Sequence, residues 1–371
     1  MSAFAYLDHN ATSPLRPAAL AAMTEALRAG GNPSAVHAVG RRARSMVDKA
    51  RGQVAALVGA PASEVVFTSG GTEANAMALA GSGRRRVLVS AIEHESVRRS
   101  VPGAAVLPVN VDGVLDLAAL ERALAASSEP ALVSVMAANN ETGVIQPIAE
   151  VVRLARAAGA LVHCDAVQAA GKIALDVAAL GVDYLSLAAH KLGGPTGIGA
   201  LVVRGLAPFS PDRRGGAQET NRRAGTENLS GIVGFGAAAV EAGQGLSPDL
   251  RDRTEAALRG LAPSAVVHGV RAARLPNTLF VSMPGVAAET QVMAFDLAGI
   301  CVSAGSACSS GKVHRSATLV AMGVDDAVAA TAVRMSFGWN SVPEDSDRLI
   351  AAWRDLYVRA GCSGIGNARA A

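Results

Sequence analysis

The sequence predicts an α/β protein with a mostly parallel sheet covered by helices on both faces. Between residues 65 and 203, short and continuously apolar runs alternate with helical segments, the pattern of parallel strands buried on both faces. Hydrophobic residues make up 50% of the 371 residues, which is enough for a large core. A chain of this length usually forms two domains. The alternation of apolar runs and helical segments changes in character after about residue 245.

The N-terminal part is expected to be largely helical. Residues 4–7 read as a short strand and 8–14 as a polar turn. A helix is expected at 17–29, and a loop rich in glycine at 30–34 separates it from an amphipathic helix at 39–58. Apolar residues of the second helix recur at helical spacing: Val47, Ala50, Val54 and Leu57.

From residue 65 onward, strands and helices alternate. The expected strands are 65–68, 87–90, 105–109, 131–136, 161–164, 182–187 and 198–203, the last of which pairs back onto the sheet. The expected helices are 71–80, 95–101, 116–126 and 147–158. Ligands of such sheets bind at the carboxyl ends of the strands, so polar residues there are the first candidates for a site.

The C-terminal part reads as a smaller α/β domain. Helices are expected near 248–261, 287–298, 316–322 and 344–358, with strands at 277–283, 300–303 and 333–337. We expect a large domain over 15–245, and a small domain formed by 1–14 together with 246–371.

Composition excludes several classes of function. The net charge is only +3 and no basic stripe with aromatic residues is visible, so we expect no nucleic-acid partner. No apolar stretch is long enough for a membrane span and no signal peptide precedes the first strand, which predicts a cytoplasmic protein. The cysteines are too few and scattered for a disulfide framework or a metal site: Cys164, Cys301, Cys308 and Cys362.

The most informative stretch lies around Lys191. The apolar run 182–187 predicts a buried strand, followed by small residues, His190-Lys191 and a glycine-rich turn. A lysine at the end of a buried strand is costly unless it is neutralised, paired or used covalently. A Schiff base to an aldehyde cofactor such as pyridoxal phosphate (PLP) is one such use. The alternative is a lysine that reaches past the strand end to water.

Other strand ends carry residues suited to a cofactor. Gly71 and Thr72 open a helix, where free N–H groups and the helix dipole favour an anion, although an ordinary turn gives the same pattern. His94 could stack on a flat ligand or move protons, but a lone histidine is commonly structural. Asn139 and Asn140 favour a turn or bind a ring or carboxylate.

Asp165 and Gln168 follow another strand. An aspartate at the end of an apolar strand needs a cationic partner or strong donors, and a protonated pyridine nitrogen is such a partner. Gln168 could reach the ring's hydroxyl oxygen. The alternative for Asp165 is a helix cap. The chance occurrence of all these features at successive strand ends is much less probable than the chance occurrence of any one of them.

Together these motifs resemble those of the cysteine desulfurases, which are PLP enzymes of fold type I in the class-V aminotransferase group. The likeness extends from Tyr6 to about Arg348, and its last motif is similar to that of the NifS/IscS-type (group I) branch. The motifs are YLDHNAT (6–12), TSGGTEAN (68–75), NNETG (139–143), DAVQ (165–168), HK (190–191), RAGTEN (223–228) and SAGSACSS (303–310).

The resemblance implies a role for each site residue. Lys191 forms the Schiff base with PLP and takes the substrate's Cα proton, His94 stacks on the ring and acts as a base, and Asp165 pairs with the pyridine nitrogen. Gln168 binds the ring oxygen. The remaining implied residues hold the phosphate (Gly71, Thr72, His190, and Thr226 from the other subunit of a homodimer) or the substrate carboxylate (Asn140 and Arg334).

Cys308 is the sulfur acceptor that the resemblance implies. It lies in a run of small residues with two glycines, which reads as a loop and argues against a buried structural thiol. Cys164 and Cys301 lie in apolar strands and are interpreted as structural. Arg334, between apolar neighbours, could bind a carboxylate of the substrate or an internal acidic residue. Ala188 departs from the family, which usually has a phosphate-binding serine there.

The implied reaction converts L-cysteine to L-alanine and leaves the sulfur on Cys308 as a persulfide. The implied partner is a sulfur-acceptor or iron–sulfur scaffold protein. Two alternatives stay open among class-V PLP enzymes, an aminotransferase and a selenocysteine lyase. A PLP-free scaffold that passes sulfur between partners is a third, against which the set of Lys191, Asp165 and His94 argues.

Overall fold

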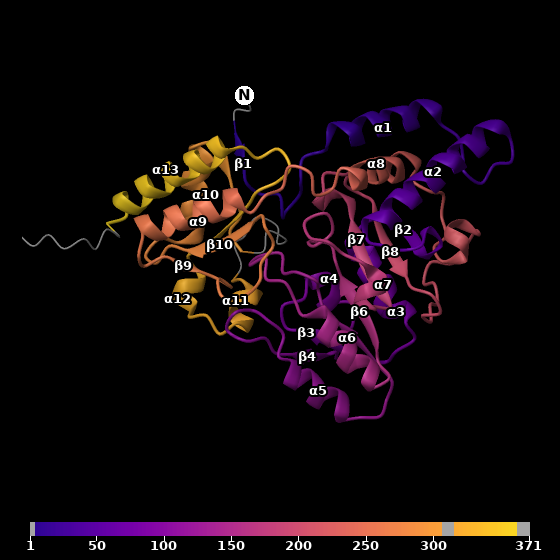
Figure 1. Ribbon diagram of the computed structural model, residues 1–371, viewed down its shortest axis with the longest axis horizontal. Helices are drawn as coiled ribbons and strands as arrows, with labels where there is room; N and C mark the ends of the chain where they lie inside the picture. The colour runs from indigo at the N-terminus through magenta and orange to yellow at the C-terminus, as the bar shows by residue number, and fades with distance from the viewer. Residues whose placement is uncertain (1–3, 306–314, 362–371) are drawn as a thin grey trace, which may run out of the picture.

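The computed structural model describes residues 4–305 and 315–361. Cys308 and Cys362 therefore lie outside the described residues. Figure 1 shows two groups of elements, one with most of the sheet and the helices up to α8, the other with the C-terminal helices and the strands β9 and β10. Within residues 4–305 and 315–361, every helix is too short or too polar to span a lipid bilayer.

A seven-stranded sheet forms the centre of the larger group, with strand order β2-β8-β7-β6-β5-β3-β4. Only β8 runs antiparallel to its neighbours, so the predicted mostly parallel sheet is confirmed. The strand expected at 198–203 to pair back onto the sheet is β8. It lies inside the sheet, between β2 and β7. The bounds are β2 Val65–Thr68, β3 Arg86–Ser90, β4 Ala105–Leu107, β5 Ala131–Ser134, β6 Leu161–Asp165, β7 Tyr184–Ala188 and β8 Gly199–Val203.

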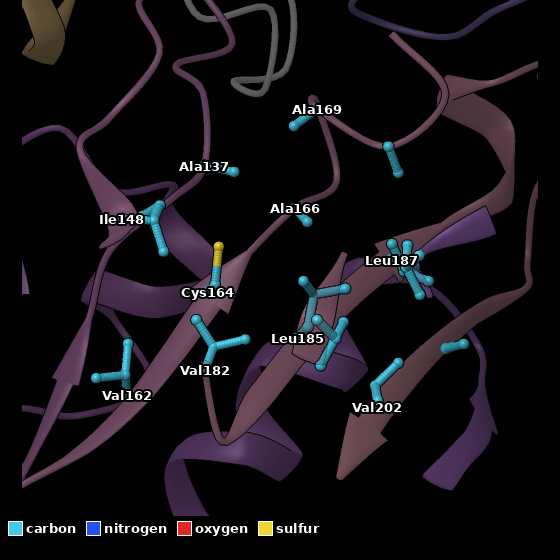
Figure 2. Packing of buried hydrophobic residues seen from close by; sticks show 14 of the residues in the cluster. Ala137, Ile148, Val162, Cys164, Ala166, Ala169, Val182, Leu185, Leu187 and Val202 are labelled. Atoms are coloured by element: carbon cyan, nitrogen blue, oxygen red, sulfur yellow. The ribbon is translucent and has the colours of Figure 1, made fainter. Parts of the chain in front are cut away.

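Alternate residues of each strand enter different cores on the two faces of this sheet. Figure 2 shows Cys164, Leu185 and Leu187 in the core on one face, together with Ile148. These side chains pack with residues of several helices. These helices are α1 (Pro17–Ala29), α2 (Ala38–Leu57), α5 (Leu117–Ala125), α6 (Ile148–Ala157), α7 (Val177–Leu180) and α8 (Leu229–Val240). On the other face, Tyr184 and Leu201 pack against α3 (Gly71–Gly81) and α4 (Glu95–Arg98). Helices on both faces keep water from the strands and leave their ends open for ligands.

Helix α8 was missed by the sequence prediction. Its residues are almost all apolar, so no amphipathic period marks it, and its glycines argue against a helix. These glycines let α8 approach α1 and α2 closely. A Cβ on Gly234 would lie 2.5 Å from Cγ of Met23, and one on Gly236 would lie 2.8 Å from Cα of Ala50.

The C-terminal elements form a smaller sheet in which β10 lies between β12 and β9 and runs antiparallel to both. β1 pairs in parallel with β11, so the N-terminal residues join the C-terminal ones. Trp353 and Phe295 stack in the core beneath the helices. The bounds are β1 Ala5–Tyr6, α9 Asp249–Leu261, β9 Val266–Val267, β10 Thr278–Ser282, α10 Ala288–Leu297, β11 Ile300–Cys301, α11 Ala317–Ala321, α12 Asp326–Ala329, β12 Ala332–Ser336 and α13 Pro343–Arg359.

Candidate active site

A cavity of about 290 Å³ lies where the carboxyl ends of the central strands meet residues from the two chain termini. The polar residues predicted from the separate strand ends line this one cavity: Gly71, Thr72, His94, Asn140, Asp165, Gln168, His190, Lys191 and Arg334. Parallel strands end at the same edge of a sheet, which is why motifs far apart in the sequence meet there.

Lys191 ends a single 3₁₀ turn, Ala189–Lys191, that directly follows β7. The turn brings the side chain back over the sheet edge toward the first residues of the chain. Its Nζ donates to the carbonyl oxygens of Asn10 at 2.6 Å and Ala11 at 2.8 Å. A lysine amine within the cavity, held by neutral carbonyls, is positioned as a nucleophile toward a bound aldehyde.

Asp165 is the last residue of β6 and is 6% exposed. Its carboxylate accepts hydrogen bonds from Nδ2 of Asn75 at 2.7 Å and from the backbone N–H of Val167 at 3.0 Å. Both of these donors are neutral, and a protonated ring nitrogen in the cavity would give this buried carboxylate a positive partner.

Glu93 is a second buried acid near Asp165. Its Oε1 accepts from the N–H of Met136 at 2.7 Å, while Oε2 has no hydrogen-bond partner in the described part of the chain. Burial, with the negative charge of Asp165, raises the pKa of Glu93 well above its usual range. This shift favours the neutral form of Glu93, the form that adds no second negative charge beside Asp165.

The start of α3 supplies an anion-binding cradle. Its first turn contains Gly71 and Thr72, whose backbone N–H groups have no partner within the helix. Only glycine fits at the first position, because a Cβ on Gly71 would lie 2.7 Å from Cγ2 of Val167. His190 lies on the same cavity, and burial, with the charges of Lys191 and Lys172, lowers the pKa of His190 to about 4. His190 is therefore a neutral hydrogen-bonding group there.

His94 caps the short helix α4. Its Nδ1 accepts the backbone N–H of Ser96 at 3.1 Å, and the Ser96 hydroxyl lies 2.8 Å from the same nitrogen. Because a backbone N–H can only donate, the neutral ring carries its proton on Nε2. This tautomer leaves Nε2–H as a donor and fixes the ring at the cavity wall.

Arg334 in β12 forms an internal ion pair and also lines the cavity. Its Nη2 pairs with Oδ1 of Asp8 at 2.7 Å, and its Nη1 donates to the carbonyl oxygen of Asn140 at 3.0 Å. The side chain is 2% exposed, and its Nε has no hydrogen-bond partner among residues 4–305 and 315–361. The internal ion pair is thus present, and the guanidinium also lines the cavity, where an anionic ligand would find a partly unsatisfied cation.

Thr226 does not line this cavity. It lies at a separate cavity of about 200 Å³ with Arg223 and Glu227. Cys308 lies outside the described residues. Cys164 is buried, and burial together with the charges of Asp165 and Glu93 raises the pKa of its thiol.

Among residues 4–305 and 315–361, no cluster of His, Cys, Asp or Glu could hold a metal ion.

Sequence reasoning missed Asn10 and Lys172. Asn10 lies in the recognised motif 6–12, but no role was assigned to it. In the structure it lines the cavity, and both its side chain and its carbonyl are hydrogen-bonded to other site residues. The only signal for Lys172 was its spacing of four residues after Gln168, which is too common to identify a site residue.

The fold and site can be compared with known proteins. A family model described as aminotransferase class-V matches residues 5–349. This chain belongs to the class-V aminotransferase family. Its similar relatives include a cysteine desulfurase of Cereibacter sphaeroides, 44% identical over 93% of each chain, and an IscS-like cysteine desulfurase of Mycobacterium tuberculosis, 39% identical over 96% of this chain and 97% of the relative. An X-ray structure of a NifS-like protein from Rickettsia africae superposes with a TM-score of 0.89, at 34% identity over 96% of this chain and 99% of that one.

Enzymes of this family depend on PLP, and the donor set of the cavity fits that cofactor. The helix start at Gly71 and Thr72 suits a phosphate, Asp165 suits a pyridine nitrogen and Lys191 suits an aldehyde. Ala188 at the end of β7 also lines the cavity and has no side-chain donor. The phosphate hydrogen bond that a serine would give is therefore absent at this position.

Proposed function

We propose that this protein is a PLP-dependent cysteine desulfurase that converts L-cysteine to L-alanine and transfers the sulfur to a cysteine of its own. The observation that carries the proposal is that Lys191 and Asp165 line one cavity with Arg334. This combines an amine for the cofactor's aldehyde, an acid for its ring and a cation for the carboxylate of an amino acid. The relatives named cysteine desulfurase, at 39–44% identity, support this choice of reaction.

The cofactor would be held by residues from several strand ends. Lys191 would bind it covalently, Asp165 would keep the ring nitrogen protonated and His94 would stack on the ring. The phosphate would lie at Gly71, Thr72 and His190, with Gln168 donating to the ring oxygen. When bound, PLP supplies an electron sink for the α-carbon of the amino acid.

The chain's own residues would carry the remaining steps. Arg334 and Asn140 would orient the substrate carboxylate, and the amine of Lys191, once released, would take the proton from Cα. His94 would be the base that makes the thiolate, since only the thiolate is a good nucleophile. With Nε2 already protonated, it would accept that proton on Nδ1, the nitrogen that contacts Ser96 in this structure.

Cys308 would be the group that receives the sulfur. Its thiolate attacks the sulfur of the substrate, an S–S bond forms and the C–S bond breaks. The electron pair of that bond stays with the carbon skeleton, which becomes alanine after protonation. The net change is L-cysteine plus Cys308 thiol to L-alanine plus Cys308 persulfide, without an external oxidant. A sulfur-acceptor protein, such as an iron–sulfur scaffold, would then take the persulfide sulfur.

We further propose a cytoplasmic homodimer in which Thr226 of one subunit reaches the phosphate site of the other. The position of Thr226 at a separate cavity of its own subunit supports this reading.

We also propose two domains, 15–245 and 1–14 with 246–371. The pairing of β1 with β11 supports the assignment of the first residues to the small domain.

The decisive test separates a desulfurase from its alternatives by products. Purified, PLP-loaded protein is given L-cysteine with a reductant, L-selenocysteine, or L-alanine with a 2-oxo acid. We expect alanine and sulfide in equal amounts from L-cysteine and no amino-group transfer. Transfer without sulfide would indicate an aminotransferase, and turnover of selenocysteine alone would indicate a selenocysteine lyase. Purified protein without cofactor absorbance would revive the PLP-free scaffold.

Asn75 offers a further prediction about Asp165. Asn75→Ala removes the 2.7 Å hydrogen bond to the Asp165 carboxylate, so this group is held less firmly against the ring nitrogen. We expect the apoprotein's affinity for PLP to fall by about tenfold, the usual effect of losing a hydrogen bond to a buried charged group. Titration of apoprotein with PLP measures it. Exposed Lys49→Met on α2 is the control, and equal affinity of Asn75→Ala and this control would contradict the prediction.

A further inference from the structure

Lys172 lies behind the cavity wall. The chain leaves β6 in consecutive turns, with the N–H groups of Ala169 and Ala170 both bonded to the carbonyl of Ala166. These turns place Lys172 one turn beyond Gln168, with its amine pointing back toward the site. Lys172 does not line the main cavity, but it shares a cavity of about 20 Å³ with Lys191 on the other side.

The amine of Lys172 makes two short hydrogen bonds to site residues. Its Nζ donates to Oδ1 of Asn10 at 2.7 Å and to Oε1 of Gln168 at 2.8 Å. The Gln168 amide nitrogen in turn donates to the carbonyl oxygen of Asn10 at 2.9 Å. Lys191 donates to that same carbonyl oxygen at 2.6 Å. The two lysines are therefore tied to one residue, Lys172 through its side chain and Lys191 through its backbone.

These bonds decide which atoms the two amides present. A lysine amine donates, so Gln168 must turn its oxygen to Lys172 and its nitrogen to Asn10. An amide nitrogen carries two hydrogens, and Asn10 takes only one of them, so the second can be donated into the main cavity. Asn10 is fixed in the same way: its Oδ1 also accepts from Asn277, so its Nδ2 faces Asn140 and Thr278.

Lys172 is buried close to two other cationic side chains. Burial, followed by the positive charges of Lys191 and Arg334, lowers the pKa of Lys172 well below its usual range.

We propose that Lys172 is a positioning residue of this active site, which orients the amides of Gln168 and Asn10 so that Gln168 donates toward the ring oxygen of the cofactor. This inference rests on the proposed function, because that function supplies the cofactor. Without Lys172, Oε1 of Gln168 loses its 2.8 Å donor, and the Gln168 amide is then held through its nitrogen at the Asn10 carbonyl. Oδ1 of Asn10 loses one of its two donors and keeps Asn277.

The test is a double-mutant cycle on the affinity of the apoprotein for PLP. We expect Lys172→Met to weaken binding by about tenfold in the wild-type background, the usual effect of leaving a buried acceptor unpaired. In the Gln168→Leu background the same change should cost about twofold or less, because the amide that it orients is gone. The absorbance of bound PLP in Lys172→Met should shift toward that of Gln168→Leu. Lys49→Met, a change of an exposed lysine, should match wild type.

Two results would overturn the inference while the proposed function stands. One is a Lys172→Met protein that binds PLP as wild type does. The other is an equal loss in both backgrounds, which would mean that Lys172 supports the structure independently of Gln168. If Lys172→Met does not fold, Lys172→Arg, which keeps N–H donors, should retain the wild-type absorbance, and a spectrum like that of Gln168→Leu would overturn the inference. Wild-type protein that binds no PLP would instead overturn the proposed function itself.

Discussion

Replacing Lys191 by alanine is expected to lower the turnover of L-cysteine by about 1,000-fold or more, because the change removes both a nucleophile and a general base. The amine of Lys191 is the group of the cavity that can bind an aldehyde covalently and afterwards take a proton from Cα. Its hydrogen bonds to Asn10 and Ala11 hold it at the sheet edge. Alanine formation from L-cysteine measures the loss.

Lys191→Arg is the matched variant for this prediction. It keeps a positive charge and N–H donors near the same carbonyls but does not form the covalent link to an aldehyde. We expect it to be as inactive as Lys191→Ala and to release PLP on extensive dialysis, whereas the wild-type protein retains it. Substantial activity in Lys191→Arg would contradict the role assigned to Lys191.

Cys308→Ala is expected to keep the PLP absorbance and lose turnover by about 1,000-fold or more, because the nucleophile that receives the sulfur is gone. Sulfide release from L-cysteine with a reductant, recorded together with absorbance, measures both properties in one experiment. The assignment of Cys308 rests on the motif SAGSACSS (303–310), since the residue lies outside the described part of the chain.

Cys301→Ala is the control for Cys308→Ala. Cys301 is partly exposed in β11, and burial with the charges of Asp296 and Asp8 raises the pKa of its thiol, so it is a poor nucleophile. We expect it to leave turnover within about twofold of wild type, as surface changes away from a site usually do. Equal activity of Cys308→Ala and wild type would mean that the chain is a different class-V PLP enzyme.

The parallel sheet and the members of the cavity were predictable from the sequence for one physical reason. Buried parallel strands read as continuous apolar runs, and the residues that follow them must meet at one edge. His94, Asp165 and Lys191 each follow such a run, and the structure brings them to one cavity. Each residue alone had an ordinary structural explanation, and the shared edge is what makes them a site.

Other features depend on contacts that no local pattern encodes. The partners of Lys172 include Asn10, which is 162 residues away in the sequence, and those of Arg334 include Asp8, which is 326 residues away. Helix α8 lacks an amphipathic period because both α1 and α2 cover it. Its glycines, which local propensity reads as helix-breaking, are needed for that close packing.

The most direct test of the central claim follows the sulfur atom itself. Wild-type protein loaded with PLP is mixed with a limited amount of L-cysteine in the absence of reductant, quenched and analysed by peptide mass spectrometry. The account predicts that one additional sulfur atom appears on the peptide containing Cys308, in an amount equal to the alanine formed, and that reductant removes it. Alanine formation with Cys308 unmodified, or the added sulfur on Cys164 or Cys301 instead, would contradict it.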